Sequence, residues 1–294
     1  MSHLLFSLGL AAAIALAMPG GRSIAQTITP ETTVPDMAVG QERVSQLIQT
    51  MRIGDMLDVM RMEGLDYGAS LEADMFGGDA GAGWQGNLGR IYDVSQMQSQ
   101  IEDVLLQQFA SDPATLTDIE AFFSSDQGQR ILMLEVEARR AMLDDAAKEA
   151  AELRAAQMTE DRDPRMDLLK RFAEVNDLIE MNVAGAMSSN LAFYQGMADE
   201  GAFDNNLTEE QMLADVWAQE PQVRADSEKW LMSFLTLAYE PLADTDLEAY
   251  IAFSESASGQ RLNTALFAAF DQVFRTISRD LGQAAARQMQ GQDI

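Results

Sequence analysis

The sequence predicts an all-α protein, a helical bundle or short helical array made of two tandem repeats with no β-sheet. Apolar residues recur at helical spacing along most of the chain, as in Val44, Leu47, Ile48 and Met51. No segment shows the strict apolar and polar alternation that indicates a half-buried strand. A short motif near residue 125 occurs again near residue 256, so we expect one helical unit to be present twice.

The first 25 residues have the pattern of a cleavable export signal. Leu4 to Met18 is an uncharged apolar run, long enough for the middle of a signal peptide and short for a membrane span. Ser23 and Ala25 place small residues at the positions that precede a cut before Gln26. We therefore expect a periplasmic or secreted protein, with an uncleaved membrane anchor as the alternative.

Changes in composition divide the rest of the chain. Residues 26–37 are rich in Thr and contain two prolines, a composition typical of a disordered tether. A charged run at 159–163 ends in Asp163, which is suited to cap a helix that starts at Pro164. This predicts a first helical repeat over 38–158, a linker over 159–163, a second repeat over 164–290 and a frayed tail over 291–294.

Helix signals can be placed within each repeat. The apolar spacing predicts helices over 94–109, 112–122 and 125–153 in the first repeat, and over 229–239 in the second. Residues 208–211 fit a capping box that would start a further helix.

The long helix predicted over 125–153 carries two opposite-charge pairs at the supportive four-residue spacing. These are Glu135 with Arg139 and Asp144 with Lys148. We expect both pairs on its exposed side.

Composition excludes several classes of function. The chain has no Cys, and its one histidine, His3, lies in the predicted signal. The mature protein would therefore lack the side chains of Ser-His and Cys-His nucleophile pairs and of the usual zinc sites. The full chain carries 47 acidic against 20 basic residues, a net charge of −27, which disfavours binding to nucleic acid or to anionic membranes. We predict no catalytic residue, no cofactor and no metal site.

The repeat is clearest in one ungapped stretch. A shift of 131 residues gives seven identities in sixteen positions, between residues 116–131 and 247–262. Upstream, a shift of 122 residues gives a weaker match of Ile53 to Val175 and of Asp93 to Asp215. Duplication with an insertion in the second copy is the simplest interpretation.

The shared motif reads S-x-x-G-Q-R and follows a short apolar helix in each repeat. Its members are Ser125, Gly128, Gln129 and Arg130 in the first copy, and Ser256, Gly259, Gln260 and Arg261 in the second. The Ser would cap a new helix, and the Gly at its third position would let the preceding helix approach closely. The Gln and Arg could then meet a neighbouring carbonyl or carboxylate. A packing corner between helices is the main interpretation, and a ligand site that uses the Gln and Arg is the alternative.

At these residues the chain resembles a family of bacterial exported proteins known as domain of unknown function 2059. The pattern of an aromatic residue followed by S-x-x-G-Q-(K/R) matches residues 122–130 and 253–261. Asp126 and Ala257 stand where such proteins often have Pro, and here two copies are fused in one chain. The resemblance implies an exported helical fold and no particular activity.

Three further segments contain candidate site residues. Asp244, Asp246, Glu248 and Glu255 imitate a calcium loop, but Ala249 replaces its required Gly, so a helix start is the better interpretation. Methionines gather near Tyr67, where they predict core packing or a groove; these are Met56, Met60, Met62 and Met75. The Gly-rich segment 77–89, which contains Trp84, is predicted to be a flexible connection.

These observations favour a non-catalytic binding or interaction module. Its partner would be an unidentified protein, peptide or apolar ligand, held in a groove between the two halves. The alternative is a hydrolase or lyase that depends on carboxylates and uses no metal or nucleotide. Converging acids in a cleft would favour the enzyme, and an open apolar groove would favour the binding module.

Overall fold

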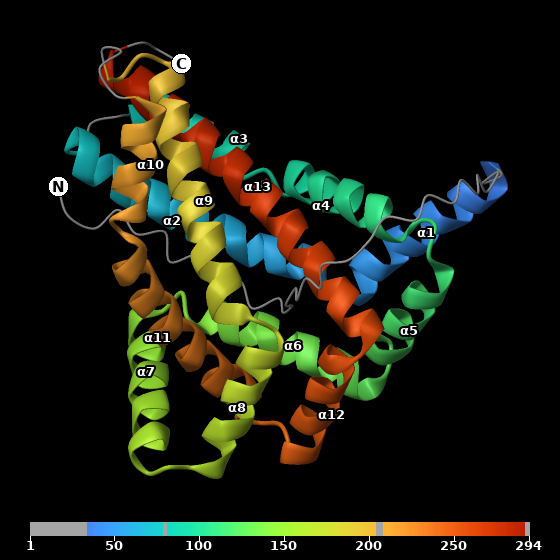
Figure 1. The fold of residues 1–294 in the computed structure, drawn as a ribbon. Coiled ribbons are helices and arrows are strands. Elements are labelled where there is room, and N and C mark those ends of the chain that lie inside the picture. The colour runs from blue at the N-terminus through green and yellow to red at the C-terminus, as the bar shows by residue number, and fades with distance from the viewer. Residues whose placement is uncertain (1–33, 79–80, 204–207, 292–294) are drawn as a thin grey trace.

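Helices account for all the regular structure in the part of the chain that the structure describes (Figure 1). The computed structural model describes residues 34–78, 81–203 and 208–291, and within these it contains thirteen helices and no strand. The all-α prediction is confirmed. The predicted signal, residues 26–33 of the tether and residues 292–294 of the tail lie outside the described residues. None of the described helices is both long enough and apolar enough to cross a membrane.

The helices follow one another with short connections. Their bounds are α1 Val34–Thr50, α2 Ile53–Phe76, α3 Gly81–Ile91, α4 Val94–Phe109, α5 Pro113–Phe123, α6 Asp126–Ala141, α7 Asp145–Glu160, α8 Pro164–Val175, α9 Leu178–Asp199, α10 Glu209–Trp217, α11 Glu220–Tyr239, α12 Asp244–Glu255 and α13 Ala257–Met289. Helix α1 therefore begins inside the segment that was predicted to be a tether.

Side-chain caps explain where many helices begin. Asp163 accepts a hydrogen bond from the Arg165 amide and Pro164 takes the first position of α8, as the sequence predicted. Thr208 and Gln211 form the predicted capping box at the start of α10.

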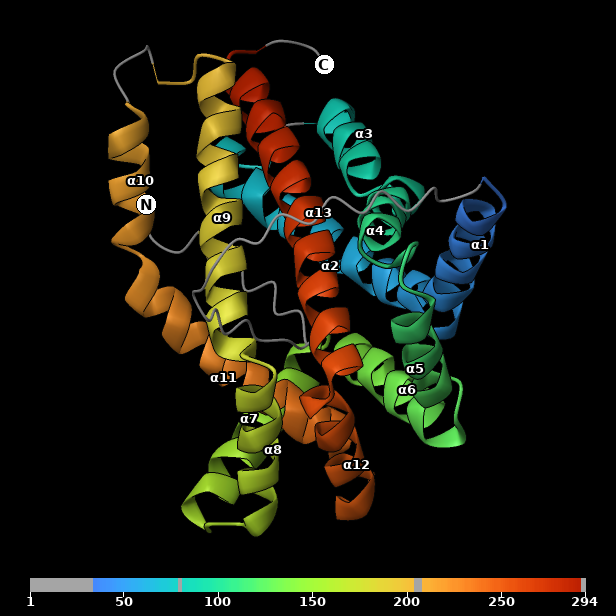
Figure 2. The same ribbon diagram turned by 45° about the vertical axis from the view of Figure 1, so that its right-hand side comes forward.

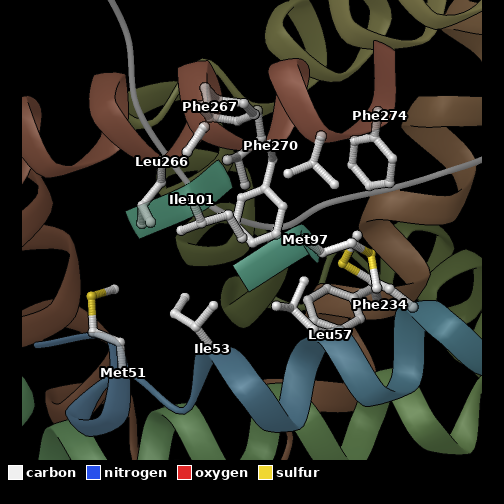
Figure 3. Packing of buried hydrophobic residues seen from close by; sticks show 14 of the residues in the cluster. Met51, Ile53, Leu57, Met97, Ile101, Phe234, Leu266, Phe267, Phe270 and Phe274 are labelled. Atoms are coloured by element: carbon white, nitrogen blue, oxygen red, sulfur yellow. The ribbon is translucent and has the colours of Figure 1, made fainter. Parts of the chain in front are cut away.

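One large core unites both predicted repeats. The 33-residue helix α13 is its spine, with α9 along one side and α4 across another (Figures 1 and 2). Figure 3 shows Phe270 of α13 gathered with Met97 and Ile101 of α4 and Leu57 of α2. The last helix of the chain thus completes a core to which the first repeat contributes.

Helices α9 and α13 run side by side and come into backbone contact. A Cβ on Gly196 would lie closer than 3.0 Å to the carbonyl oxygen of Arg279, and one on Gly282 equally close to that of Phe193. Glycine at both positions removes the side chains that would hold the helices apart. This contact fixes the spacing of the two helices near their C-terminal ends.

The Gly-rich segment is not the flexible connection that was predicted, because most of it forms α3. Trp84 is fully buried, and its indole nitrogen donates to the Gly68 carbonyl at 3.0 Å. On α2, Gly64 and Gly68 leave room for Tyr92 and Leu88, which a Cβ at either glycine would strike. Buried aromatic and aliphatic side chains therefore hold a helix that its glycines alone would disfavour.

The helix predicted over 125–153 is also different in the structure. It breaks after Ala141, and Asp144 caps α7 by accepting from the Ala147 amide at 2.9 Å. One of the two pairs predicted on its exposed side is buried as well: Glu135 is 6% exposed and Arg139 is 1% exposed. Each charged group instead has a partner on another helix.

Candidate functional site

The two copies of the S-x-x-G-Q-R motif form corners with the same local geometry. The Ser125 hydroxyl oxygen accepts from the Gly128 amide at 3.0 Å, and that of Ser256 accepts from the Gly259 amide at 3.0 Å. Both hydroxyls also donate to the carbonyl three residues earlier, at 2.6 Å. The predicted caps are confirmed at α6 and α13.

The glycines of the motif permit close approach of the preceding helix. A Cβ on Gly128 would lie closer than 3.0 Å to the Phe122 carbonyl oxygen, and one on Gly259 equally close to that of Phe253. Because these clashes involve backbone atoms, no side-chain rotation relieves them. Both glycines therefore have a packing role.

The glutamines tie each corner to an earlier helix. The side-chain amide of Gln129 donates to the backbone carbonyls of Phe123 and Thr50 at 2.7 and 2.8 Å. The side-chain amide of Gln260 donates to the backbone carbonyls of Ser254 and Val175 at 3.0 and 3.5 Å. Thr50 ends α1 and Val175 ends α8, so each glutamine bonds the end of the corresponding helix in its own half.

The arginine of each motif bonds to residues of the other half. Arg130 donates to the Pro241 carbonyl, just before α12, at 2.8 Å. Arg261 pairs with Asp112, the cap of α5, and donates to the Gln108 carbonyl. Between the corners, the rings of Phe122 and Phe253 stack with their centroids 4.2 Å apart. These contacts with the chain itself favour the packing interpretation over a ligand site.

The acidic stretch at 244–255 is helix α12. Asp244 pairs with Arg165, Glu255 pairs with Arg171 at 2.7 Å, and Asp246 accepts from Gln127. The described residues contain no group of three or more side chains placed to hold a metal ion.

The methionine cluster does not outline a groove. Met60 is 2% exposed in the core, and Met56 and Met75 are half-buried against it. Met62 is exposed. The core interpretation therefore suits three of the four.

A pocket of about 420 Å³ lies between α9 and α13. It falls within the range of roughly 300 to 1,000 Å³ that is usual for small-molecule sites. Its lining is mostly apolar, and its members are Met181, Asn182, Ala184, Gly185, Ala186, Ser188, Ser189, Thr264, Phe267, Ala268, Phe270, Asp271 and Phe274. This pocket lies within the second half of the chain and not between the two halves, where the groove was predicted.

Small side chains create this pocket. One face of α9 lines it with Met181 and with the small residues Ala184, Gly185 and Ser188, which follow at helical spacing. Opposite them, α13 contributes three phenylalanines, at positions 267, 270 and 274. A Cβ on Gly185 would meet nothing within 4 Å, so the space beside it is open. The helices touch at Gly196 and Gly282, and the hollow lies nearer their N-terminal ends.

Asp271 is the one charged side chain among the lining residues. Burial raises the pKa of this half-buried carboxyl, while a hydrogen bond from Ser188 and the charge of Arg275 act in the opposite direction. Arg275 is 3.9 Å away and its side chain is 59% exposed. The carboxyl therefore lies against the pocket with only a weak ionic partner.

A second unusual carboxyl lies away from this pocket. Burial raises the pKa of Glu135 to about 7, against the opposing effect of hydrogen bonds from Tyr239 and Tyr250. The Tyr239 hydroxyl donates to it at 2.6 Å. Its enclosure in the core indicates a structural group and not an accessible acid.

Sequence reasoning missed the α9–α13 pocket. The available signal was the run Ala184-Gly185-Ala186 followed by Ser188-Ser189 inside a helix. Small residues on a helix face indicate either close packing or a space, and only the position of α13 decides between them.

No family model, no curated protein and no solved structure matches this chain. The resemblance to the exported helical family therefore stays a prediction.

Proposed function

We propose that this protein is a non-catalytic binding module that holds a small apolar ligand between α9 and α13. The observation that supports this function is the pocket of about 420 Å³ with three phenylalanines and one charged residue in its lining. Ligand sites are typically concave and apolar with few polar groups. The volume suits a small molecule better than a folded partner.

The alternative, a carboxylate-dependent hydrolase or lyase, has less support. Acid and base chemistry of this kind commonly uses two carboxyl groups whose surroundings separate their pKa values. Asp271 is the one carboxyl group in the lining of the pocket, and Glu135 bonds to Tyr239 inside the core. Binding is the function that the described side chains support better.

The proposal places the binding module outside the cytoplasm, in the periplasm or secreted. It rests on the apolar run from Leu4 to Met18 and the small residues before Gln26. Mass analysis of the N-terminus of protein recovered from the periplasmic fraction tests this. We expect a chain that starts near Gln26, and an intact chain found only in membranes would contradict the localisation.

Filling the pocket tests the binding function. In Gly185→Leu the new side chain enters open space, and leucine is a better helix former than glycine, so folding should be retained. The neutral fluorescent probe N-phenyl-1-naphthylamine should bind the wild-type protein saturably. We expect Gly185→Leu to weaken that binding at least about tenfold, because a loss of only about 1.4 kcal/mol in binding free energy has this effect.

Gly86→Leu is the matched control. Gly86 also has open space at its Cβ, and it lies on the exposed side of α3 away from the pocket. This variant should bind the probe like the wild type. Absence of saturable binding to the wild type, or equal binding by a folded Gly185→Leu protein, would contradict the proposed function.

A further inference from the structure

We propose that the ligand is a cationic amphiphile, an apolar chain or ring system with a protonated amine that lies against Asp271. This inference rests on the proposed function and specifies its ligand. It follows from the position of a single acidic group within an otherwise uncharged pocket.

The carboxylate has room for a stronger partner. It accepts a hydrogen bond from Ser188, but Arg275, the one cation that pairs with it among the described residues, is 3.9 Å away and mostly exposed. Arg275 is not part of the lining, so its guanidinium does not occupy the pocket. A half-buried carboxylate gains more from a close cation than an exposed one does, since the surrounding dielectric is lower. An ammonium group entering the pocket would supply that cation.

The aromatic lining supports the same choice. Phe267 and Phe274 flank Asp271 along α13, about one turn before it and one turn after it, and both line the pocket. Aromatic faces attract cations as well as hydrocarbon, so the same side chains suit both parts of the ligand. The apolar body would lie over the small residues around Gly185.

Charge disfavours the common anionic alternative. A fatty acid would bring its carboxylate towards Asp271, in a protein whose net charge is −27. Like charges at close range oppose binding, and the long-range field slows the approach of anions. A neutral alcohol of the same length lacks both the attraction and the repulsion.

A series of twelve-carbon ligands that differ only in the head group provides the test. Dodecylamine, dodecanol and dodecanoate would compete with N-phenyl-1-naphthylamine at pH 7. The two ionic ligands are kept below their micelle concentrations and dodecanol below its solubility limit. We expect dodecylamine to bind most tightly and dodecanoate least tightly, with at least about a tenfold difference between them. Asp271→Asn should remove this difference and leave dodecanol binding nearly unchanged.

Asp280→Asn is the control for net charge. Asp280 lies on the same helix, outside the lining of this pocket, and the substitution changes the net charge by the same amount. It should keep the wild-type order of ligands. If it removes the preference as fully as Asp271→Asn does, the general field and not Asp271 selects the ligand, and the inference is wrong.

The outcomes separate the inference from the function on which it rests. Dodecanol binding that Gly185→Leu abolishes, together with equal affinities for dodecylamine and dodecanoate, would overturn the cationic ligand and keep the apolar site. If neither the probe nor any of the three ligands binds, the proposed function itself fails.

Discussion

Glu135 shows how far the environment of one residue can depart from its local sequence. Its four-residue spacing from Arg139 suggested a surface ion pair, but the two side chains face different partners. The Glu135 carboxyl meets the hydroxyl of Tyr239, and the Arg139 guanidinium makes two hydrogen bonds with Glu63 at 2.9 and 2.7 Å. The spacing correctly predicts a helix, and the predicted exposure of this helix face is wrong.

The raised pKa of Glu135 predicts a pH-dependent stability. Its pKa is about 7 in the folded protein against an ordinary value of 4.5, so the folded form holds the proton more tightly than the unfolded form. The resulting stabilisation is fully present below about pH 4.5 and is lost as the pH rises through 7. A shift of this size corresponds to roughly 3 kcal/mol.

Glu135→Gln isolates this contribution. The amide can still accept from Tyr239 but cannot ionise, so the variant should match the wild type near pH 5 and be more stable by roughly 2 kcal/mol at pH 8. Urea unfolding of both proteins at the two pH values measures the difference. If the free energies of unfolding differ by the same amount at pH 5 and pH 8, Glu135 does not titrate as inferred.

At the scale of elements, helices with their own caps and apolar periods were predictable. Helices α4, α5 and α10 begin close to where the sequence predicts them. Their N-cap residues, in order Asp93, Asp112 and Thr208, each accept a hydrogen bond from a backbone amide of the first turn. Helix α3 was missed because contacts with α2 outweigh its glycines. The pocket was missed because its shape depends on where α13 lies against α9, which no local pattern records.

The structure also corrects the upstream alignment of the two halves. The equivalent bonds of Gln129 and Gln260 place Thr50, and not Ile53, opposite Val175. Arg52 and Asp177 support this register, since each has a positive φ just before α2 or α9. The match of Asp93 to Asp215 is wrong, because Asp93 caps α4 while Asp215 lies inside α10. Duplication itself stays a prediction.

Glycine substitutions at the two corners test their equivalence. A Cβ at Gly128 or Gly259 would strike backbone atoms, so Gly128→Ala and Gly259→Ala should each destabilise by about 1 to 3 kcal/mol in denaturant unfolding. Gly54→Ala, with open space at its Cβ, should be neutral or slightly stabilising. Strong destabilisation at one corner and none at the other would mean that the corners are not structurally equivalent.

For the whole molecule, the packing of helices from one half against helices of the other determines the core more than the predicted linker at 159–163 does. Helix α13 packs on α4 of the first half, and α6 packs on α11 of the second. Separate cores for the two predicted repeats would leave these faces uncovered. The shared core therefore predicts that both halves unfold together.

Tryptophans in the two halves can report on this cooperativity. Trp84 is fully buried in the first half, and Trp230 packs against the core in the second, where it stacks on Phe234. Trp217 is 61% exposed and can be replaced by Phe in both reporter proteins. A protein that retains only Trp84 and one that retains only Trp230 should report midpoints that agree with their own far-UV circular dichroism, because a two-state transition looks the same to every probe. This internal comparison removes the effect of each substitution on stability. If the Trp84 signal changes at a lower denaturant concentration than the helical signal of the same protein, the first half unfolds separately and the single-core description fails.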